Sequence, residues 1–201
     1  MENFLKTQWN KYKARKTKAG IVIDFLFLFL FIAMINPPTR KTISSFVIRY
    51  TMSSPKESSN KTQLTDKDYD WRYRDLQGQT KHFADLKGKV VFLNLWATWC
   101  PPCVAELGSI DALYKEYKDK VEFVLVSNED GSKIKSFLEK KGYTISSNTY
   151  MDEIPKLLYS NSIPATYVIS KNGELVVRKK GAAKWDSDKS KALLDKLITE
   201  K

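Results

Sequence analysis

The 201-residue sequence is poor in the side chains that usually bind metals, with only two cysteines and one histidine. A structural zinc ion takes about four protein ligands. Three possible ligands are too few for such a site, and we expect neither a metal nor a cofactor. The two cysteines, Cys100 and Cys103, are separated by two residues, so a disulfide between them would close a loop too short to restrict the unfolded chain much. A purely structural disulfide is therefore the weaker alternative, and the pair favours redox chemistry.

Most of the sequence also lacks a strong net charge. Residues 1–61 contain 11 of the 34 basic residues against three acidic ones, a net charge of +8, whereas the other 140 residues carry 23 basic and 20 acidic residues, a net charge of +3. Nucleic-acid-binding domains typically carry a basic patch. The nearly balanced charge of the larger part therefore argues against a nucleic-acid partner, and the basic N-terminal part favours a membrane surface instead.

Only one long apolar run is present, at residues 19–35, and Asp24 is its one charged residue. As a helix it would span about 26 Å, slightly less than the hydrocarbon core of a bilayer at about 30 Å. Snorkelling side chains or local thinning of the bilayer can make up the difference. We predict a transmembrane helix that ends before Asn36, with Asp24 near the interface; a functional intramembrane carboxylate is the alternative for Asp24.

No small-x-small cleavage site precedes Asn36, which favours an uncleaved signal anchor over the alternative, a cleaved signal peptide. Six basic residues precede the run, against Arg40 and Lys41 just after it. The positive-inside rule therefore places the N-terminus in the cytoplasm. The predicted organisation is a cytoplasmic basic segment at 1–18, the anchor at 19–35, a linker at 36–63 and a globular domain at 64–201 outside the membrane.

The segment Trp99-Cys100-Pro101-Pro102-Cys103 joins a buried strand predicted at 89–96 to a helix predicted at 101–118. In the first turn of a helix, free backbone N–H groups and the helix dipole stabilise a thiolate. Pro101 suits the first helical position, where its missing N–H costs nothing. Cys100 is therefore the predicted nucleophile, and Cys103 can then attack the mixed disulfide and resolve it.

The rest of the pattern predicts an α/β fold with a mixed sheet covered on both faces. The predicted elements are a hairpin at 70–82, a strand at 121–127, a helix at 132–141, a strand within 143–150, a short helix at 154–159, a hairpin of 165–170 and 174–179 around Asn172-Gly173, and a closing helix at 188–201.

Two segments, 94–103 and 162–167, together resemble the thioredoxin superfamily, and specifically its membrane-anchored TlpA/ResA-like thiol–disulfide oxidoreductases. The resemblance covers about residues 70–198 and implies a thioredoxin-like three-layer fold with a mixed central sheet, preceded by one N-terminal transmembrane helix. It also implies that Pro164 is a cis-proline and that Ile163 presents its backbone to a substrate chain. Trp99, Pro101 and Pro102 would complete the substrate-binding surface.

The resemblance places an acidic residue near the active site at the position of Glu106. Glu106 follows Cys103 by one helical turn, so the two side chains can share a face and exchange a proton; the alternative is a solvated surface glutamate. Asn94 stands where ordinary thioredoxins have a buried aspartate, and an amide cannot accept a proton as a carboxylate does. Trp96 fits the core better than a substrate groove, and His82 fits a hairpin surface.

Together with the predicted anchor, the resemblance implies a protein disulfide reductase in the cytoplasmic (inner) membrane of a bacterium, with its domain in the periplasm. Its partners would be extracytoplasmic thiol or disulfide proteins, including apocytochromes in cytochrome c maturation, and a membrane thiol carrier would donate electrons. The oxidising direction is an alternative, since the residues do not fix it. A tethered binding module with a structural disulfide is a second alternative. A peroxidase of the peroxiredoxin kind is a third, disfavoured because Ala97 stands where a Thr-x-x-Cys pattern needs threonine.

Overall fold

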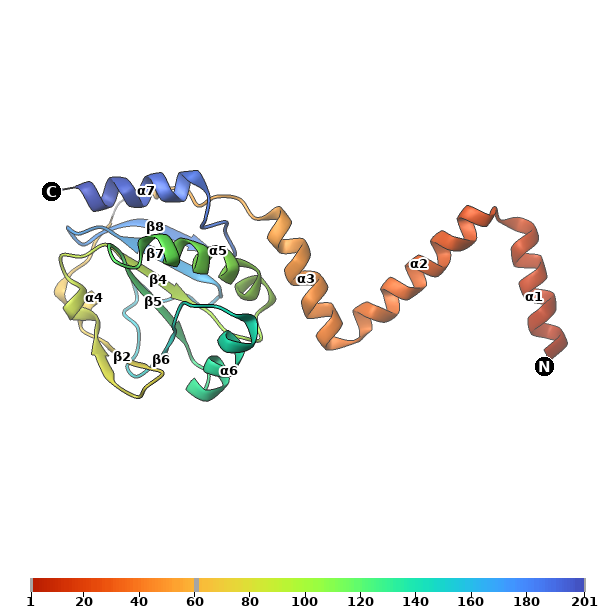
Figure 1. Ribbon diagram of the computed structural model, residues 1–201, viewed down its shortest axis with the longest axis horizontal. Helices are drawn as coiled ribbons and strands as arrows, with labels where there is room; N and C mark the ends of the chain where they lie inside the picture. Colours follow the sequence, from red (N-terminus) through yellow and green to blue (C-terminus); the bar gives the residue numbers. More distant parts are fainter. Residues whose placement is uncertain (1, 60–61, 201) are drawn as a thin grey trace. The chain divides into compact units, whose positions relative to one another are not determined.

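A computed structural model describes residues 2–59 and 62–200 of the chain, which form two compact units, Met1–Ile43 and Ser44–Lys201 (Figure 1). The first unit contains α1 (Glu2–Arg15) and α2 (Lys18–Ile35), and the division falls within α3 (Pro37–Thr51). The predicted anchor at 19–35 is thus helical throughout. Within the described part of the chain, no helix combines the length and the apolar character needed to cross a membrane.

The second unit is built on one eight-stranded sheet with the strand order β1-β8-β7-β4-β5-β6-β2-β3. Its elements in chain order are β1 (Thr62–Gln63), α4 (Asp66–Tyr69), β2 (Arg72–Asp75), β3 (Thr80–His82), η1 (Phe83–Leu86), β4 (Val91–Leu95), α5 (Pro101–Tyr117), β5 (Glu122–Ser127), α6 (Gly131–Lys141), β6 (Asn148–Tyr150), β7 (Ala165–Ile169), β8 (Glu174–Lys180) and α7 (Asp188–Thr199). Strands β4, β5 and β6 run parallel and all other neighbours pair antiparallel, which confirms the predicted mixed sheet.

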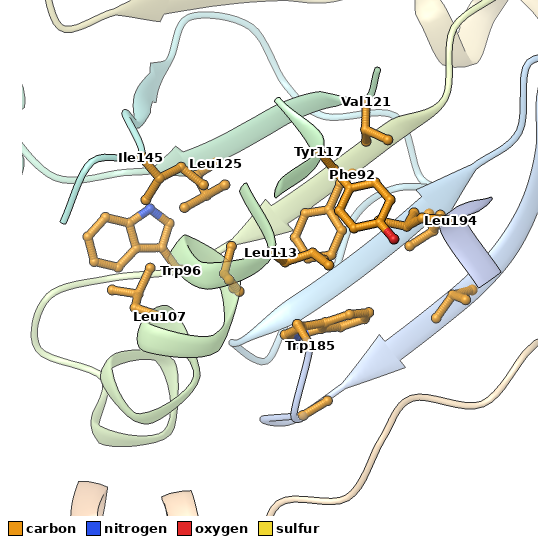
Figure 2. Close-up of a cluster of buried hydrophobic side chains, with 14 of the residues drawn as sticks. Phe92, Trp96, Leu107, Leu113, Tyr117, Val121, Leu125, Ile145, Trp185 and Leu194 are labelled. Carbon is orange, nitrogen blue, oxygen red and sulfur yellow. The ribbon is translucent and has the colours of Figure 1, made fainter. Parts of the chain in front are cut away.

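The central strand β4 is buried along its whole length because both faces of the sheet are covered. Phe92 and Trp96 join a core cluster with residues of α5, α6 and α7 (Figure 2). Leu93 and Leu95 point to the other face, where they pack with residues of α4, η1 and the loop before β7. This alternation explains why β4 is a continuous apolar run. Asn94, the one polar residue within β4, lies on the same face as Phe92, toward α5.

Both predicted hairpins are confirmed. Strands β2 and β3 pair with Arg72 opposite His82, and β7 pairs with β8 across the turn that contains Gly173. Gly173 has a φ of 77°, a conformation that glycine adopts without strain. The helices predicted at 101–118, 132–141 and 188–201 correspond to α5, α6 and α7.

The predicted helix at 154–159 is wrong. This segment forms a single turn, closed by the Leu158 N–H donating to the Pro155 carbonyl at 2.9 Å, and continues as a loop to β7. One turn of helix costs more conformational entropy than one hydrogen bond returns, so packing decides the shape. Here Ile154 and Leu158 are buried in the core as the chain turns. In the segment predicted as a linker, 36–63, the structure has α3 and the short strand β1.

Candidate active site

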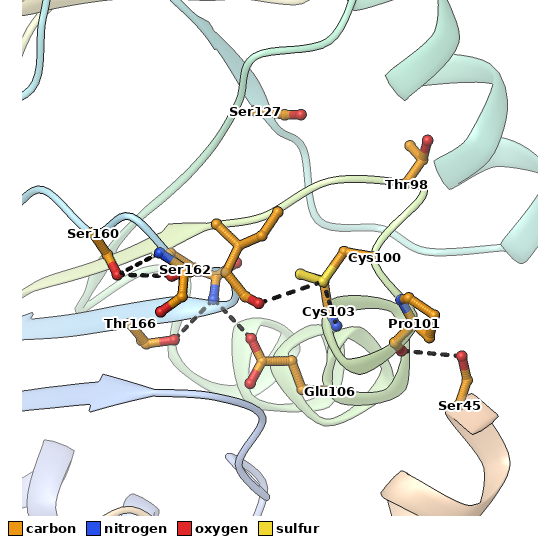
Figure 3. Close-up of a disulfide and its surroundings, with 12 residues drawn as sticks. Ser45, Thr98, Cys100, Pro101, Cys103, Glu106, Ser127, Ser160, Ser162 and Thr166 are labelled. Carbon is orange, nitrogen blue, oxygen red and sulfur yellow. Dashed lines mark hydrogen bonds between the residues drawn. A yellow bond between two sulfur atoms is a disulfide. The ribbon is translucent and has the colours of Figure 1, made fainter. Parts of the chain in front are cut away.

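The two cysteines form a disulfide at the N-terminus of α5 (Figure 3). Cys100 is the N-cap residue, and Pro101 and Pro102 occupy the first turn, where no intrahelical N–H donor is needed. The backbone N–H of Cys103 donates to Cys100 Sγ at 3.3 Å. This donor and the helix dipole both stabilise negative charge on Cys100 Sγ. Cys100 is 3% exposed and Cys103 is fully buried, so an incoming disulfide reaches Cys100 first.

The predicted substrate-binding residues come from two distant parts of the chain that meet at the disulfide. The Ile163–Pro164 peptide bond is cis, as the resemblance implies. The carbonyl oxygen of Ile163 lies 3.7 Å from Cys100 Sγ. Trp99 is 51% exposed directly before the nucleophile, which makes its indole available to a partner chain. Pro101 and Pro102 are half-buried beside it.

Glu106 is a buried carboxyl group one helical turn beyond Cys103, so the alternative of a solvated surface glutamate is wrong. Its side chain is held on both oxygens: Asn94 Nδ2 donates to Oε1 at 2.9 Å, while the Ala183 N–H and the Trp185 indole N–H donate to Oε2 at 3.0 and 3.1 Å. Burial raises the pKa of Glu106 from 4.5 to about 7, against the lowering effect of these three donors. A group with this pKa can exchange protons near neutrality.

Asn94 connects Glu106 to the strand that follows the cis-proline. Its Nδ2 also donates to Thr166 Oγ1 in β7 at 2.8 Å, and both Asn94 and Thr166 are buried. Trp96 lies in the core, where its indole N–H donates to Ser147 Oγ at 2.9 Å, so it does not frame a groove. His82 is exposed on β3, as expected for a hairpin surface.

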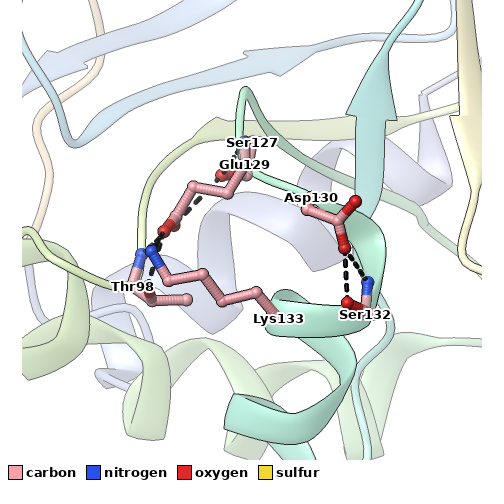
Figure 4. A network of polar contacts seen from close by, with 6 residues as sticks. All are labelled: Thr98, Ser127, Glu129, Asp130, Ser132 and Lys133. Carbon is pink, nitrogen blue, oxygen red and sulfur yellow. Dashed lines mark hydrogen bonds and ion pairs between the residues drawn. The ribbon is translucent and has the colours of Figure 1, made fainter.

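The carboxylate of Glu129, whose side chain is 6% exposed, holds the loop that precedes Cys100 (Figure 4). Its two oxygens accept hydrogen bonds from the backbone N–H of Thr98 at 2.5 Å and from the Thr98 hydroxyl at 2.7 Å, and it forms an ion pair with Lys133. Burial alone would raise the pKa of Glu129, but Lys133 and the Thr98 donors outweigh it and lower the pKa. Glu129 thus stays ionised and fixes the turn that carries Trp99 and Cys100. Glu129 is not among the residues predicted from the sequence.

Comparison with known proteins gives a family and a fold. The model of the Redoxin family matches residues 63–195. A thiol-disulfide oxidoreductase ResA of Bacillus cereus is 37% identical over 107 residues, which are 51% of this chain and 61% of that protein. A protein of the same name from Oceanobacillus iheyensis is 38% identical over 116 residues, 56% of this chain and 60% of that protein. The chain thus matches about three fifths of the length of these relatives.

Solved structures agree with the fold. A crystal structure of a putative thiol-disulfide oxidoreductase from Bacteroides vulgatus is 29% identical, with a TM-score of 0.52, and the match covers 63% of this chain and 91% of that one. A secreted disulfide oxidoreductase of Mycobacterium tuberculosis, homologous to E. coli DsbE, is 24% identical, with a TM-score of 0.56, over 66% of this chain and all of that one. At this identity the second likeness shows the thioredoxin-like fold alone.

Proposed function

Because the chain belongs to the Redoxin family, as a TlpA/ResA-like member of the thioredoxin superfamily, we propose that it is a thiol–disulfide oxidoreductase that reduces disulfides of extracytoplasmic proteins. The observation that carries the proposal is the position of Cys100 Sγ, which accepts a hydrogen bond from the Cys103 N–H at the N-terminus of α5 and lies beside the Ile163 carbonyl. The Cys103 N–H and the N-terminus of α5 stabilise a thiolate at this sulfur once the disulfide is reduced.

The reaction transfers two electrons by two thiolate displacements. The Cys100 thiolate attacks one sulfur of the partner disulfide, whose S–S bond breaks, and the other partner sulfur leaves as a thiolate that takes up a proton. The Cys103 thiol then loses its proton, and its sulfur attacks Cys100 Sγ and displaces the second partner sulfur as a thiolate, which also takes up a proton. The partner becomes a dithiol and the protein holds the disulfide. We assign to Glu106 the removal of the Cys103 proton, since its pKa of about 7 suits that transfer.

Replacing each cysteine separately tests this order of events. The Cys100→Ser variant should lose all reduction of an insulin-type disulfide, because the attacking sulfur is gone. The Cys103→Ser variant should accumulate mixed disulfides with partner proteins on non-reducing gels, because the resolving sulfur is missing. A Cys100→Ser variant that still reduces insulin contradicts the proposal. A double serine variant that still captures the same partners supports the binding-module alternative instead.

The proposal includes an anchor in the bacterial cytoplasmic (inner) membrane, with the thioredoxin-like domain in the periplasm. It is supported by the exposed apolar side chains of α2, such as Phe27 and Phe29, and by the excess of basic residues before this helix. The compartment outside that membrane is oxidising, so a reductase there needs a membrane thiol carrier as its electron donor. In right-side-out membrane vesicles, which keep the cytoplasmic face inside, we expect added protease to digest the domain and to leave residues 1–18 intact.

The direction of electron flow is tested by the reduction potential of the Cys100–Cys103 pair, equilibrated against thiol buffers. A value near that of thioredoxin, about −270 mV, is expected for a reductase, whereas a value near about −120 mV would make the protein a disulfide donor. We further propose apocytochrome cysteines as substrates, prepared for haem attachment. Reduction of a disulfide-bonded apocytochrome peptide at a rate above that of insulin is the expected result.

A further inference from the structure

The buried amide of Asn94 has one end that makes hydrogen bonds and one that does not. Its Nδ2 donates to Glu106 Oε1 and to Thr166 Oγ1, at 2.9 and 2.8 Å. Its Oδ1 is buried and has no hydrogen-bond partner in the part of the chain that the structure describes. Leaving a buried acceptor unpaired is costly, and such groups at redox or catalytic sites call for an explanation.

The partners of Glu106 restrict where a proton can be added. Oε2 accepts hydrogen bonds from the Ala183 N–H and the Trp185 indole N–H. Neither of these groups can accept a hydrogen bond. A proton on Oε2 would therefore point at a donor and break at least one of these two bonds. Oε1 remains, and its partner is the amide of Asn94, whose two ends have opposite hydrogen-bonding character.

We infer that Asn94 is a positioning residue whose side-chain amide reverses when Glu106 takes up a proton. In the arrangement observed, the two hydrogens of Nδ2 match two acceptors, the Oε1 of an ionised Glu106 and the hydroxyl oxygen of Thr166. After reversal, the two lone pairs of Oδ1 match two donors, the new Oε1–H and the Thr166 hydroxyl. Each protonation state of Glu106 thus has one complete arrangement on the side of the amide that faces Glu106 and Thr166, while the opposite end of the amide is without a hydrogen-bond partner among the described residues in either state.

The inference rests on the proposed function in one respect, the source of the proton, which is the Cys103 thiol. Among the residues that the structure describes, the charged group that acts on Glu106 is Lys179 on β8, whose charge favours the ionised carboxylate; Cys103, one helical turn earlier on α5, is titratable only when its disulfide is reduced. Asn94 on β4 and Trp185 before α7 are neutral. Because Thr166 lies two residues beyond Pro164, the reversal carries the protonation state of Glu106 to the strand that follows the cis-proline.

The test is a pH titration of the oxidised full chain by NMR, which needs no turnover. The carboxyl carbon of Glu106 and the side-chain amide of Asn94 should shift with the same midpoint, and the contact between the Asn94 amide hydrogens and the Thr166 methyl should weaken at low pH. In the Glu106→Gln variant the Asn94 signals should stay constant over the same range. An Asn94 signal that is insensitive to pH while Glu106 titrates overturns the inference.

Two substitutions at Asn94 add an independent measurement. Asn94→Leu removes the charge-assisted bond to the carboxylate and also the weaker bond that the reversed amide makes to the protonated form, so the proton affinity of Glu106 should rise, by less than about tenfold. Asn94→Asp places a second carboxyl group at hydrogen-bond distance, so the midpoint should rise further and two coupled protons should titrate. A Glu106 midpoint unchanged in both variants contradicts the inference. Absence of insulin reduction by the wild type would instead contradict the proposed function and leave this titration unaffected.

Discussion

Replacing Glu106 by glutamine should change how the stability of the protein depends on pH. The pKa of Glu106 is raised by burial from 4.5 to about 7 in the folded chain. The folded protein therefore binds this proton more tightly than the unfolded chain does, and its stability falls as the pH rises from 4.5 through 7. At about 1.4 kcal/mol for each pKa unit, the loss is ~3 kcal/mol in total, of which ~2.5 kcal/mol falls between pH 5 and pH 8.

The measurement is urea unfolding of the oxidised full chain at pH 5, 6, 7 and 8, followed by tryptophan fluorescence. The free energy of unfolding of the Glu106→Gln variant is subtracted from that of the wild type at each pH. Other titrating groups are common to both proteins and cancel in this difference. The free energy of unfolding of the wild type, minus that of the variant, should fall by ~2.5 kcal/mol from pH 5 to pH 8. A difference that stays constant over this range would refute the reasoning that burial dominates at Glu106.

Three further substitutions test separate parts of the structure. Trp99→Ala should change the free energy of unfolding by less than about 1 kcal/mol, because the side chain is half exposed, yet lower kcat/KM for a protein substrate about tenfold; equal activity would exclude Trp99 from the substrate surface. Asp111→Ala should cost about 2–4 kcal/mol in urea unfolding at pH 7, because the N–H groups of Thr144 and Ile145 lose their acceptor. The Asp111→Asn control, which keeps an acceptor oxygen, should cost less. Lys115 and the donors of Thr144 and Ile145 outweigh burial and lower the pKa of Asp111. The stability that the ionised Asp111 contributes is therefore present above about pH 4, and the difference in the free energy of unfolding between the wild type and the alanine variant should become smaller below that pH. Gly142→Ala should lower stability by about 1 kcal/mol, because Gly142 ends α6 with a φ of 69°; an unchanged thermal midpoint would contradict this.

The sequence alone predicts the elements whose pattern is local. Strand β4 is a continuous apolar run because both of its faces are covered, and the turn at Gly173 needs only the Asn-Gly pair between two apolar segments. The helix predicted at 154–159 is wrong because six residues with a proline at the second position carry no strong periodicity. Their shape is decided by the burial of Ile154 and Leu158, which no local pattern encodes.

In the candidate site, too, the residues that follow from local spacing can be predicted, whereas the contacts made by distant residues cannot. Cys100 and Cys103 are found from their spacing, and Glu106 from its place one turn further along the same helix. The environment that gives Glu106 its properties is assembled from residues that are 12 positions away in the case of Asn94, and 77 and 79 positions away for Ala183 and Trp185. Nothing in the spacing predicts that the segment before α7 folds over this carboxyl group. A glutamate on a predicted helix therefore looks like a surface residue until the sheet and that segment enclose it.

Glu129 is a loop residue whose structural role the local sequence does not predict. It lies in a short charged segment, Asn128-Glu129-Asp130, where a solvated loop is the ordinary expectation. Its carboxylate instead accepts both the backbone and the hydroxyl hydrogen bond of Thr98, 31 positions earlier, because β4 and β5 are parallel neighbours and both end at this edge of the sheet. In a parallel pair, residues just beyond the carboxyl ends of the strands meet. Adjacency of β4 and β5 can be expected from the strand–helix–strand pattern, so Glu129 could have been proposed as a partner of the Thr98 turn. The choice of Glu129 over its neighbour Asp130 could not, since Asp130 caps α6 through Ser132 instead.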